Sequence, residues 1–68
     1  MFPFSRTMRR RSVIVNLDGR AFRGILWARR GPLLVLSDAE LLEAGEKIPV
    51  DGEVVVERSR VEWVQVLP

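Results

Sequence analysis

Residues 17–27, LDGRAFRGILW, constrain the fold of this chain more than any other part of the sequence. They hold an Asp-Gly pair, in which Gly19 tolerates the positive φ angle of a tight hairpin turn. The strand expected after this turn carries Gly24 at its centre, and a glycine inside a strand marks a bend or a close backbone approach. We therefore expect this strand to bend at Gly24 and to serve two sheets, with Phe22 and Leu26 filling the core on either side.

Five segments have the β-branched and apolar alternation that is typical of strands. Between the third and fourth of these segments, we expect a polar loop at residues 43–49 and another turn at Asp51-Gly52. A short helix over residues 37–44 is an alternative, because Ser37 and Glu40 match a capping box. Strands at residues 12–17, 20–28, 33–42, 53–57 and 61–67 predict an all-β fold, a five-stranded and strongly bent small barrel.

The chain is short and lacks the residues that usually reinforce small domains. It has 68 residues, no cysteine and no histidine. Disulfides, thiolate metal sites and imidazole chemistry are therefore excluded, and the extra stability is expected from self-association or another protein. No apolar run approaches the ~20 residues that span a bilayer. The N-terminus lacks the apolar region of a signal peptide, so we expect no membrane partner and no secretion by that route.

The formal charge of +2 hides an asymmetry between the two halves of the chain. Residues 1–30 contain eight arginines and one acid, whereas residues 31–68 contain three basic and eight acidic side chains. Such a chain could bind nucleic acid through its basic half. It could equally bind copies of itself, basic end to acidic side.

Residues 1–11 are expected to form a basic N-terminal arm, and residues 12–68 the barrel domain. In the arm, Phe2 and Phe4 flank a proline, and Ser5 is placed to cap a short helical turn that runs through Arg11. We expect the two phenylalanines to dock on a neighbouring protein.

The order of these residues resembles the Sm-like family of small barrels. The first family motif matches a turn glycine, a central strand glycine and their apolar neighbours, and the third strand approaches its pattern apolar-apolar-apolar-x-Asp-Ala-x-Glu at residues 34–40. The second motif falls at residues 56–61, VERSRV. From the residues themselves, an SH3-like barrel stays open as the alternative, because it also bends a strand at glycine. The matching positions of the first motif are Leu17, Gly19, Phe22, Gly24, Ile25 and Leu26.

The chain departs from the family where RNA-binding members read bases. Those members carry Asp and Asn in the loop between the second and third strands, and this loop is ARRGP here, residues 28–32. Glu57 stands where the second motif has Arg, and Arg58 where it has Gly. A carboxylate at that place repels phosphate. The base-reading residues of the family therefore do not carry over.

The resemblance also implies assembly into a ring, in which the fourth strand of one copy pairs with the fifth strand of the next. Left unpaired, these apolar strands would be an aggregation hazard. The alternative is that their valines only fill the barrel, and alternation leaves Ile25, Trp27 and Trp63 outside the core in either case. The expected interface residues are Val54, Val55, Val56, Val61, Val64 and Val66.

The chain is also similar to small proteins encoded among the structural genes of tailed phages that infect actinobacteria. The similarity lies in the Phe- and Arg-rich start, the LDGRAFRGILW hairpin, the LLVLSDAELLE strand and the PVDGEVVVERSRVEWVQVLP ending. It implies a virion component at the neck, head or tail, and otherwise a cytoplasmic protein.

These observations predict a non-enzymatic assembly module without cofactor, metal or small-molecule substrate. Catalysis is not expected, because the serines have no histidine to activate them and the carboxylates sit on solvated faces. A solvated rim is likewise expected of Asp38, Glu40, Glu43 and Glu46. The partners would be further copies or neighbouring virion proteins. The main alternative is an Sm-like RNA- or DNA-binding protein, and a third is a small regulator of one enzyme. The residues expected to contact phosphate or an acidic partner are Arg9, Arg10, Arg11, Arg29 and Arg30.

Overall fold

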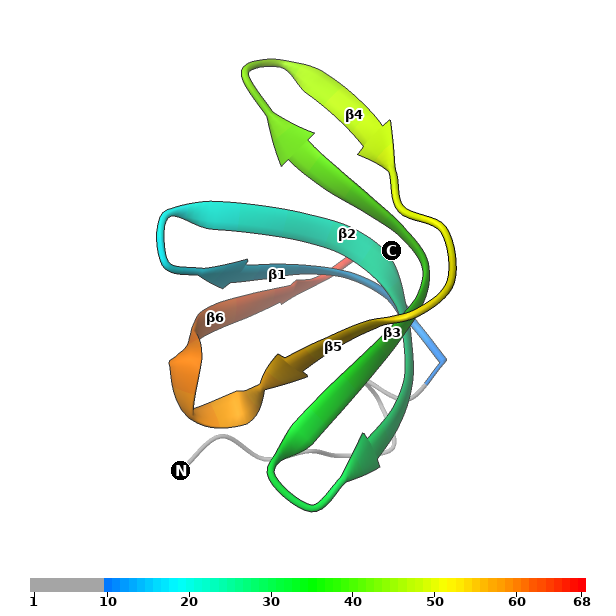
Figure 1. Ribbon diagram of the computed structural model, residues 1–68, viewed down its shortest axis with the longest axis vertical. Coiled ribbons are helices and arrows are strands. Elements are labelled where there is room, and N and C mark those ends of the chain that lie inside the picture. Colours follow the sequence, from blue (N-terminus) through cyan, green and yellow to red (C-terminus); the bar gives the residue numbers. More distant parts are fainter. Residues whose placement is uncertain (1–9) are drawn as a thin grey trace.

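A single antiparallel sheet curls into an open barrel in the computed structural model, which describes residues 10–68 (Figure 1). The order of strands in the sheet is β4-β3-β2-β1-β6, and β5 pairs with β3 at the edge that β4 also uses. The elements are β1 (Ser12–Leu17), β2 (Arg20–Arg30), β3 (Leu33–Glu43), β4 (Glu46–Pro49), β5 (Val54–Glu57), the short 3-10 helix η1 (Arg58–Arg60) and β6 (Val61–Val66).

The first hairpin confirms the prediction from the Asp-Gly pair. Leu17 lies opposite Arg20, so Asp18 and Gly19 form a two-residue turn with φ angles of 50° and 73°. Buried and half-buried residues alternate along β1, and Val13 and Val15 are fully buried. This alternation places one face of β1 in the core.

The bend of β2 at Gly24 is also confirmed. Arg23 pairs with Glu40 and Ile25 with Ser37, so Gly24 faces two residues of β3 across a β-bulge. A Cβ atom on Gly24 would lie 3.1 Å from the Ser37 carbonyl oxygen and 3.3 Å from Cβ of Leu36. Only glycine lets the two backbones approach this closely, and the close approach lets both strands turn from one half of the barrel into the other.

The strand predicted at residues 33–42 is confirmed, and its helical alternative over residues 37–44 is not formed, because β3 continues to Glu43. The polar loop expected at residues 43–49 is instead a hairpin, in which Ala44 and Gly45 turn with φ angles of 51° and 79°. β4 then pairs back onto β3, Ile48 opposite Leu41, so the barrel has six strands in place of five. The sequence EKIP has little β-propensity, and pairing with β3 is what holds it extended.

β4 and β5 follow the same edge of the bent strand β3 on either side of its bulge. β4 pairs with the last residues of β3, and β5 pairs with the first residues of β3. The intervening segment, residues 50–53, crosses the bend, and the amide of Val50 donates to the carbonyl of Ala39 over 2.9 Å. The predicted turn at Asp51-Gly52 is a bend in this crossing segment.

The core lies on the concave face of the sheet. Phe22 and Leu26 flank Gly24 as predicted, Leu26 fully buried and Phe22 half-buried against the core. No helix within residues 10–68 is long and apolar enough to cross a membrane. The core residues are Val13, Val15, Leu17, Leu26, Leu34, Leu36, Ala39 and Val56.

The barrel does not close between β5 and β6. η1 connects these two strands, but no ladder joins them within the described part of the chain. The connection is held at both ends, because the amide of Arg58 donates to the Pro32 carbonyl over 2.7 Å and the Arg60 guanidinium pairs with the Asp18 carboxylate. β5 and β6 therefore each keep one edge without a partner strand among residues 10–68.

Candidate assembly edges and nucleic-acid interface

The two open edges carry the valines that the sequence predicted as an interface, but these valines differ in burial. Val56 is 6% exposed and belongs to the core, as the barrel-filling alternative expected. Val54, Val61 and Val64 are half-buried and pack against that core. Val55 and Val66 are exposed, at 52% and 37%. The exposed members, together with the backbone of both strands, are available for a partner.

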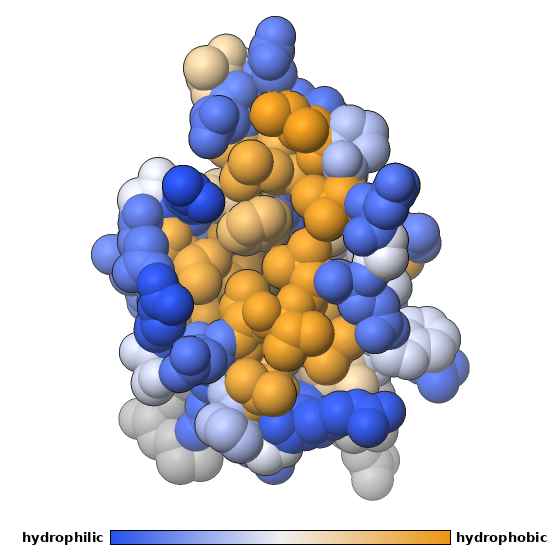
Figure 2. All heavy atoms as spheres, in the orientation of Figure 1, coloured by the Kyte–Doolittle hydropathy of each residue, from blue (hydrophilic) through white to orange (hydrophobic). Residues whose placement is uncertain are grey.

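An apolar row crosses the concave face and extends beyond the core. Val64, Val15, Phe22, Leu41 and Ile48 lie opposite one another on β6, β1, β2, β3 and β4. Val15 is fully buried, its neighbours are half-buried, and Ile48 at the end of the row is 41% exposed. Figure 2 shows apolar surface running from the β3–β4 hairpin down toward β5, with charged side chains on both sides. No part of residues 10–68 covers the outer end of this row.

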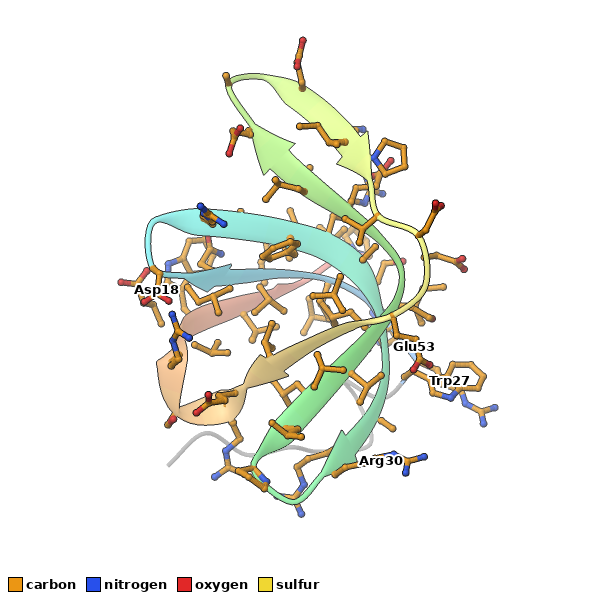
Figure 3. The ribbon with its side chains drawn as sticks, viewed as in Figure 1. Asp18, Trp27, Arg30 and Glu53 are labelled. Carbon is orange, nitrogen blue, oxygen red and sulfur yellow. The ribbon has the colours of Figure 1, made fainter. Side chains whose placement is uncertain are left out.

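One end of the barrel brings basic residues together. Arg29 and Arg30 end β2, and the following turn is Gly31-Pro32. The hydrogen bond from Arg58 to Pro32 joins η1 to this turn, and Glu57 lies opposite Leu33. The exposed Arg30 side chain points away from the barrel (Figure 3). This end can contact phosphate, although Glu57, opposite Leu33, adds one carboxylate to it.

Arg10 and Arg11 lie along the middle of β2 and not at the β2–β3 turn. The Arg10 amide donates to the Leu26 carbonyl over 2.6 Å, and the Leu26 amide donates to the Arg11 carbonyl over 3.0 Å. The Arg10 guanidinium stacks 4.6 Å from the centre of the Trp27 ring. The Arg11 guanidinium donates to the Leu67 carbonyl over 3.2 Å. The four predicted phosphate contacts that the structure describes are therefore divided between the middle of β2 and its end.

The prediction that Trp27 and Trp63 lie outside the core is confirmed, with 47% and 55% of their surface exposed. Ile25 is half-buried. The sequence analysis missed the stack of Arg10 on Trp27, because that contact depends on the hydrogen bonds that hold residues 10 and 11 against Leu26, far along the chain. Leu26 pairs with Leu36 and Ala28 with Val35, so Trp27 is an extra residue on β2.

Some predicted residues lie outside the described part of the chain, and the acidic rim holds no metal site. Phe2, Phe4, Ser5 and Arg9 precede residue 10, so the arm and its docking stay a prediction. Among residues 10–68, no three or more His, Cys, Asp or Glu side chains are grouped so that they could hold a metal ion.

Three solved structures that share this fold are Sm proteins. A heptameric archaeal Sm protein matches with a TM-score of 0.81 and 30% identity, over 91% of this chain and 93% of that one. The SmAP1 heptamer of P. aerophilum matches with a TM-score of 0.81 and 30% identity, over 91% and 85% of the two chains. The Sm protein of Pyrococcus abyssii, in complex with a uridine heptamer, matches with a TM-score of 0.78 and 28% identity, over 90% and 89%. No protein-family model and no curated protein sequence matches the chain.

The bent six-stranded sheet, open between β5 and β6, is thus a small barrel of the Sm type. The chain belongs to the Sm-like family.

Proposed function

We propose that this protein is an Sm-like RNA-binding protein that works as a closed ring of identical copies. The observation that carries the proposal is the open barrel, whose two free edges belong to different strands of the same chain. Free strand edges with apolar side chains are a liability unless another chain covers them. The RNA-binding alternative from the sequence comes ahead of the purely structural role, because a similar Sm protein is in complex with a uridine heptamer.

The edges support head-to-tail assembly. Pairing of β5 with β6 of the next copy joins two different surfaces, and such a contact repeats until it closes into a ring. It places Val55 and Val66 in an interface and brings a neighbour toward the exposed end of the apolar row at Ile48. Two of the similar structures are heptamers, so we propose seven copies.

The basic end of the barrel supports RNA binding. Arg30 is exposed beside a turn that is joined to η1, and arginine binds phosphate in a bidentate manner. The similar protein of P. abyssii is in complex with a uridine heptamer. Because residues 28–32 hold neither Asp nor Asn, we propose that this chain binds the RNA backbone with little preference for base.

Assembly is tested by light scattering on protein stripped of nucleic acid. The expected mass is about seven times the chain mass of 7.8 kDa, at both low and high salt, because strand pairing and apolar contacts are not screened. A monomer at both salt concentrations would contradict assembly through β5 and β6.

RNA binding is tested by fluorescence anisotropy with labelled single-stranded oligonucleotides. Arg30→Ala is expected to weaken binding by about tenfold or more, through the loss of a charge-assisted contact of about 1.5–3 kcal/mol. Arg20→Ala is the matched control, because Arg20 begins the same strand at the opposite end and is also exposed. Equal effects of the two changes would argue against a site at the β2–β3 turn.

A virion role stays a prediction. It follows from the resemblance of sequence segments to phage structural proteins, and no contact among residues 10–68 favours it over a ring that binds RNA.

A further inference from the structure

We infer that the convex face of the sheet holds a binding site for a free α-amino acid, in the cavity between the bulge of β3 and the strand β4. An α-amino acid carries an ammonium and a carboxylate group on the same carbon atom, and the cavity is lined by side chains of both charges. The site is separate from the RNA contacts proposed at the β2–β3 turn and does not depend on them.

The cavity has the size of a small-molecule site. Its volume is about 430 Å³, and it lies where β2 and β3 bend together. Ligand sites typically measure about 300–1,000 Å³. The backbone of the buried Gly24 forms part of its floor, and Ile25 adds an apolar side chain beside it. A ligand can therefore approach the sheet closely at this point.

Four charged side chains surround the cavity, and their charges sum to zero. Arg23 lies directly opposite Glu40 across β2 and β3, and both are half-buried. Opposite charges at such positions attract each other across a sheet. Within residues 10–68, however, neither side chain forms an ion pair or hydrogen bond, and the same holds for Asp38 and Lys47. All four are therefore available to the charged groups of a ligand.

The backbone brings two of these charges to the cavity from different elements. Gly24 faces two residues of β3, and Asp38, the first of them, has a φ angle of 50°. A bulge of this kind redirects a side chain and is often found next to a functional site. Lys47 comes from β4, on the face of the hairpin opposite to Ile48. The apolar contact expected of Ile48 between copies thus leaves Lys47 on the other side.

The mixed lining decides between classes of ligand. An RNA phosphate would meet two carboxylates here, and a metal cation would meet two basic side chains, so each would be partly repelled. A protein-docking patch is expected to be continuous and apolar, and such surface lies on the concave face instead (Figure 2). A zwitterion satisfies both signs of charge at once.

Each group of an amino acid has a matching partner in the cavity. Arg23 and Lys47 would bind the carboxylate, with the guanidinium making the bidentate contact. Asp38 and Glu40 would accept hydrogen bonds from the ammonium group. Ile25 would contact the side chain, which favours an apolar amino acid such as leucine.

The proposed ring leaves this site open. The residues that line the cavity come from β1, β2, β3 and β4, and none belongs to β5 or β6, whose edges would pair between copies. We therefore expect one amino acid for each chain.

The first experiment uses the unaltered protein and three small molecules in saturation-transfer NMR titrations. L-Leucine is expected to bind with a Kd of about 1 mM or tighter. N-Acetyl-leucine lacks the ammonium charge and leucinamide lacks the carboxylate, so each is expected to bind about tenfold more weakly or worse. Equal binding of leucine and either analogue would overturn the site, as would no binding of leucine at about 10 mM.

The second experiment repeats the leucine titration with variants. Asp38→Asn removes one charge and keeps the backbone, since asparagine also tolerates the left-handed region. Asp38→Asn and Arg23→Gln are each expected to weaken binding about tenfold. The matched controls are Glu43→Gln and Arg20→Gln, which change exposed charges on the same two strands outside the cavity.

The controls are expected to change the affinity by less than about twofold, because exposed charges outside the cavity contribute little. Equal losses in variants and controls would overturn the site and indicate a general effect of charge. Circular dichroism and light scattering check that each variant keeps its fold and mass. Should a variant fail to fold, the comparison of leucine with its two analogues on the unaltered protein decides.

Discussion

At the scale of single residues, Gly24 shows how one missing side chain permits the fold. Its φ angle does not lie in the left-handed region, so its role is the space that it leaves for β3. The turn glycines differ, since Gly45 has a φ angle of 79° and no atom within 4 Å of a Cβ placed on it. Glycine is therefore needed at position 24 because it leaves space for close packing, and at position 45 because it adopts a positive φ angle.

Replacing Gly24 tests this distinction. Gly24→Ala is expected to lower the free energy of unfolding by about 1–3 kcal/mol, because the added methyl group meets the Ser37 carbonyl and the Leu36 side chain. Gly45→Asn is the control and is expected to cost less than about 1 kcal/mol, since asparagine tolerates the left-handed region. Urea unfolding at one fixed protein concentration measures both. A larger loss at Gly45 would contradict the packing role of Gly24.

The ion pair between Asp18 and Arg60 is expected to contribute little. Both side chains are more than half exposed, and such pairs typically contribute about 0–1 kcal/mol. Asp18→Asn replaces Asp-Gly with Asn-Gly, which suits the same tight hairpin turn, and removes only the charge. We expect a loss below about 1 kcal/mol, which shrinks as salt is added. A double-mutant cycle with Arg60→Gln measures the coupling, and a large salt-independent value would show that the pair fixes η1 more firmly than expected.

At the scale of elements, the β3–β4 hairpin extends apolar surface beyond the core. Leu41 and Ile48 pair across this hairpin and continue the row that begins in the barrel. Because the hairpin projects away from β1 and β2 (Figure 1), its concave face has no cover within the described chain. The proposed ring gives this face a neighbour.

A charge at the end of the row tests that role. Ile48→Lys is expected to leave the barrel folded, because Ile48 is 41% exposed in the single chain. It is expected to weaken assembly, because the ammonium group would be buried against apolar surface. Circular dichroism checks the fold and light scattering checks the mass, with Ile48→Val as the conservative control. Unchanged mass for Ile48→Lys would place the hairpin outside the interface.

At the scale of the whole molecule, assembly and RNA binding are expected to respond differently to salt. Phosphate contacts release counterions, and two contacts alone predict about a sevenfold loss of affinity between about 50 and 200 mM salt. Strand pairing buries backbone and apolar groups, so the mass is expected to stay constant over the same range. Anisotropy and light scattering on one salt series test this. A mass that falls together with the affinity would indicate that charge pairs between copies, basic half to acidic half, hold the assembly.

Much of the barrel could be predicted because its signals are local. The turn at Gly19, the alternation of β1 and the bend at Gly24 each depend on a few consecutive residues whose backbone preferences or periodicity act on their own. The exposure of Trp27 and Trp63 followed from the same periodicity. The order of these signals also sufficed for the resemblance to the Sm-like family.

The tertiary structure alone decided the rest, because it depends on pairs of residues far apart in the chain. β4 has little strand preference of its own and is extended only because β3 offers it an edge. The stack of Arg10 on Trp27 requires residues 10 and 11 to pair with Leu26, which is far along the chain. Burial of Val56, as opposed to exposure of Val55, likewise follows from the pairing of β5 with β3, in which Val56 lies opposite Leu34. The sequence by itself determined the strand faces and turns, whereas the register between strands determined which groups meet.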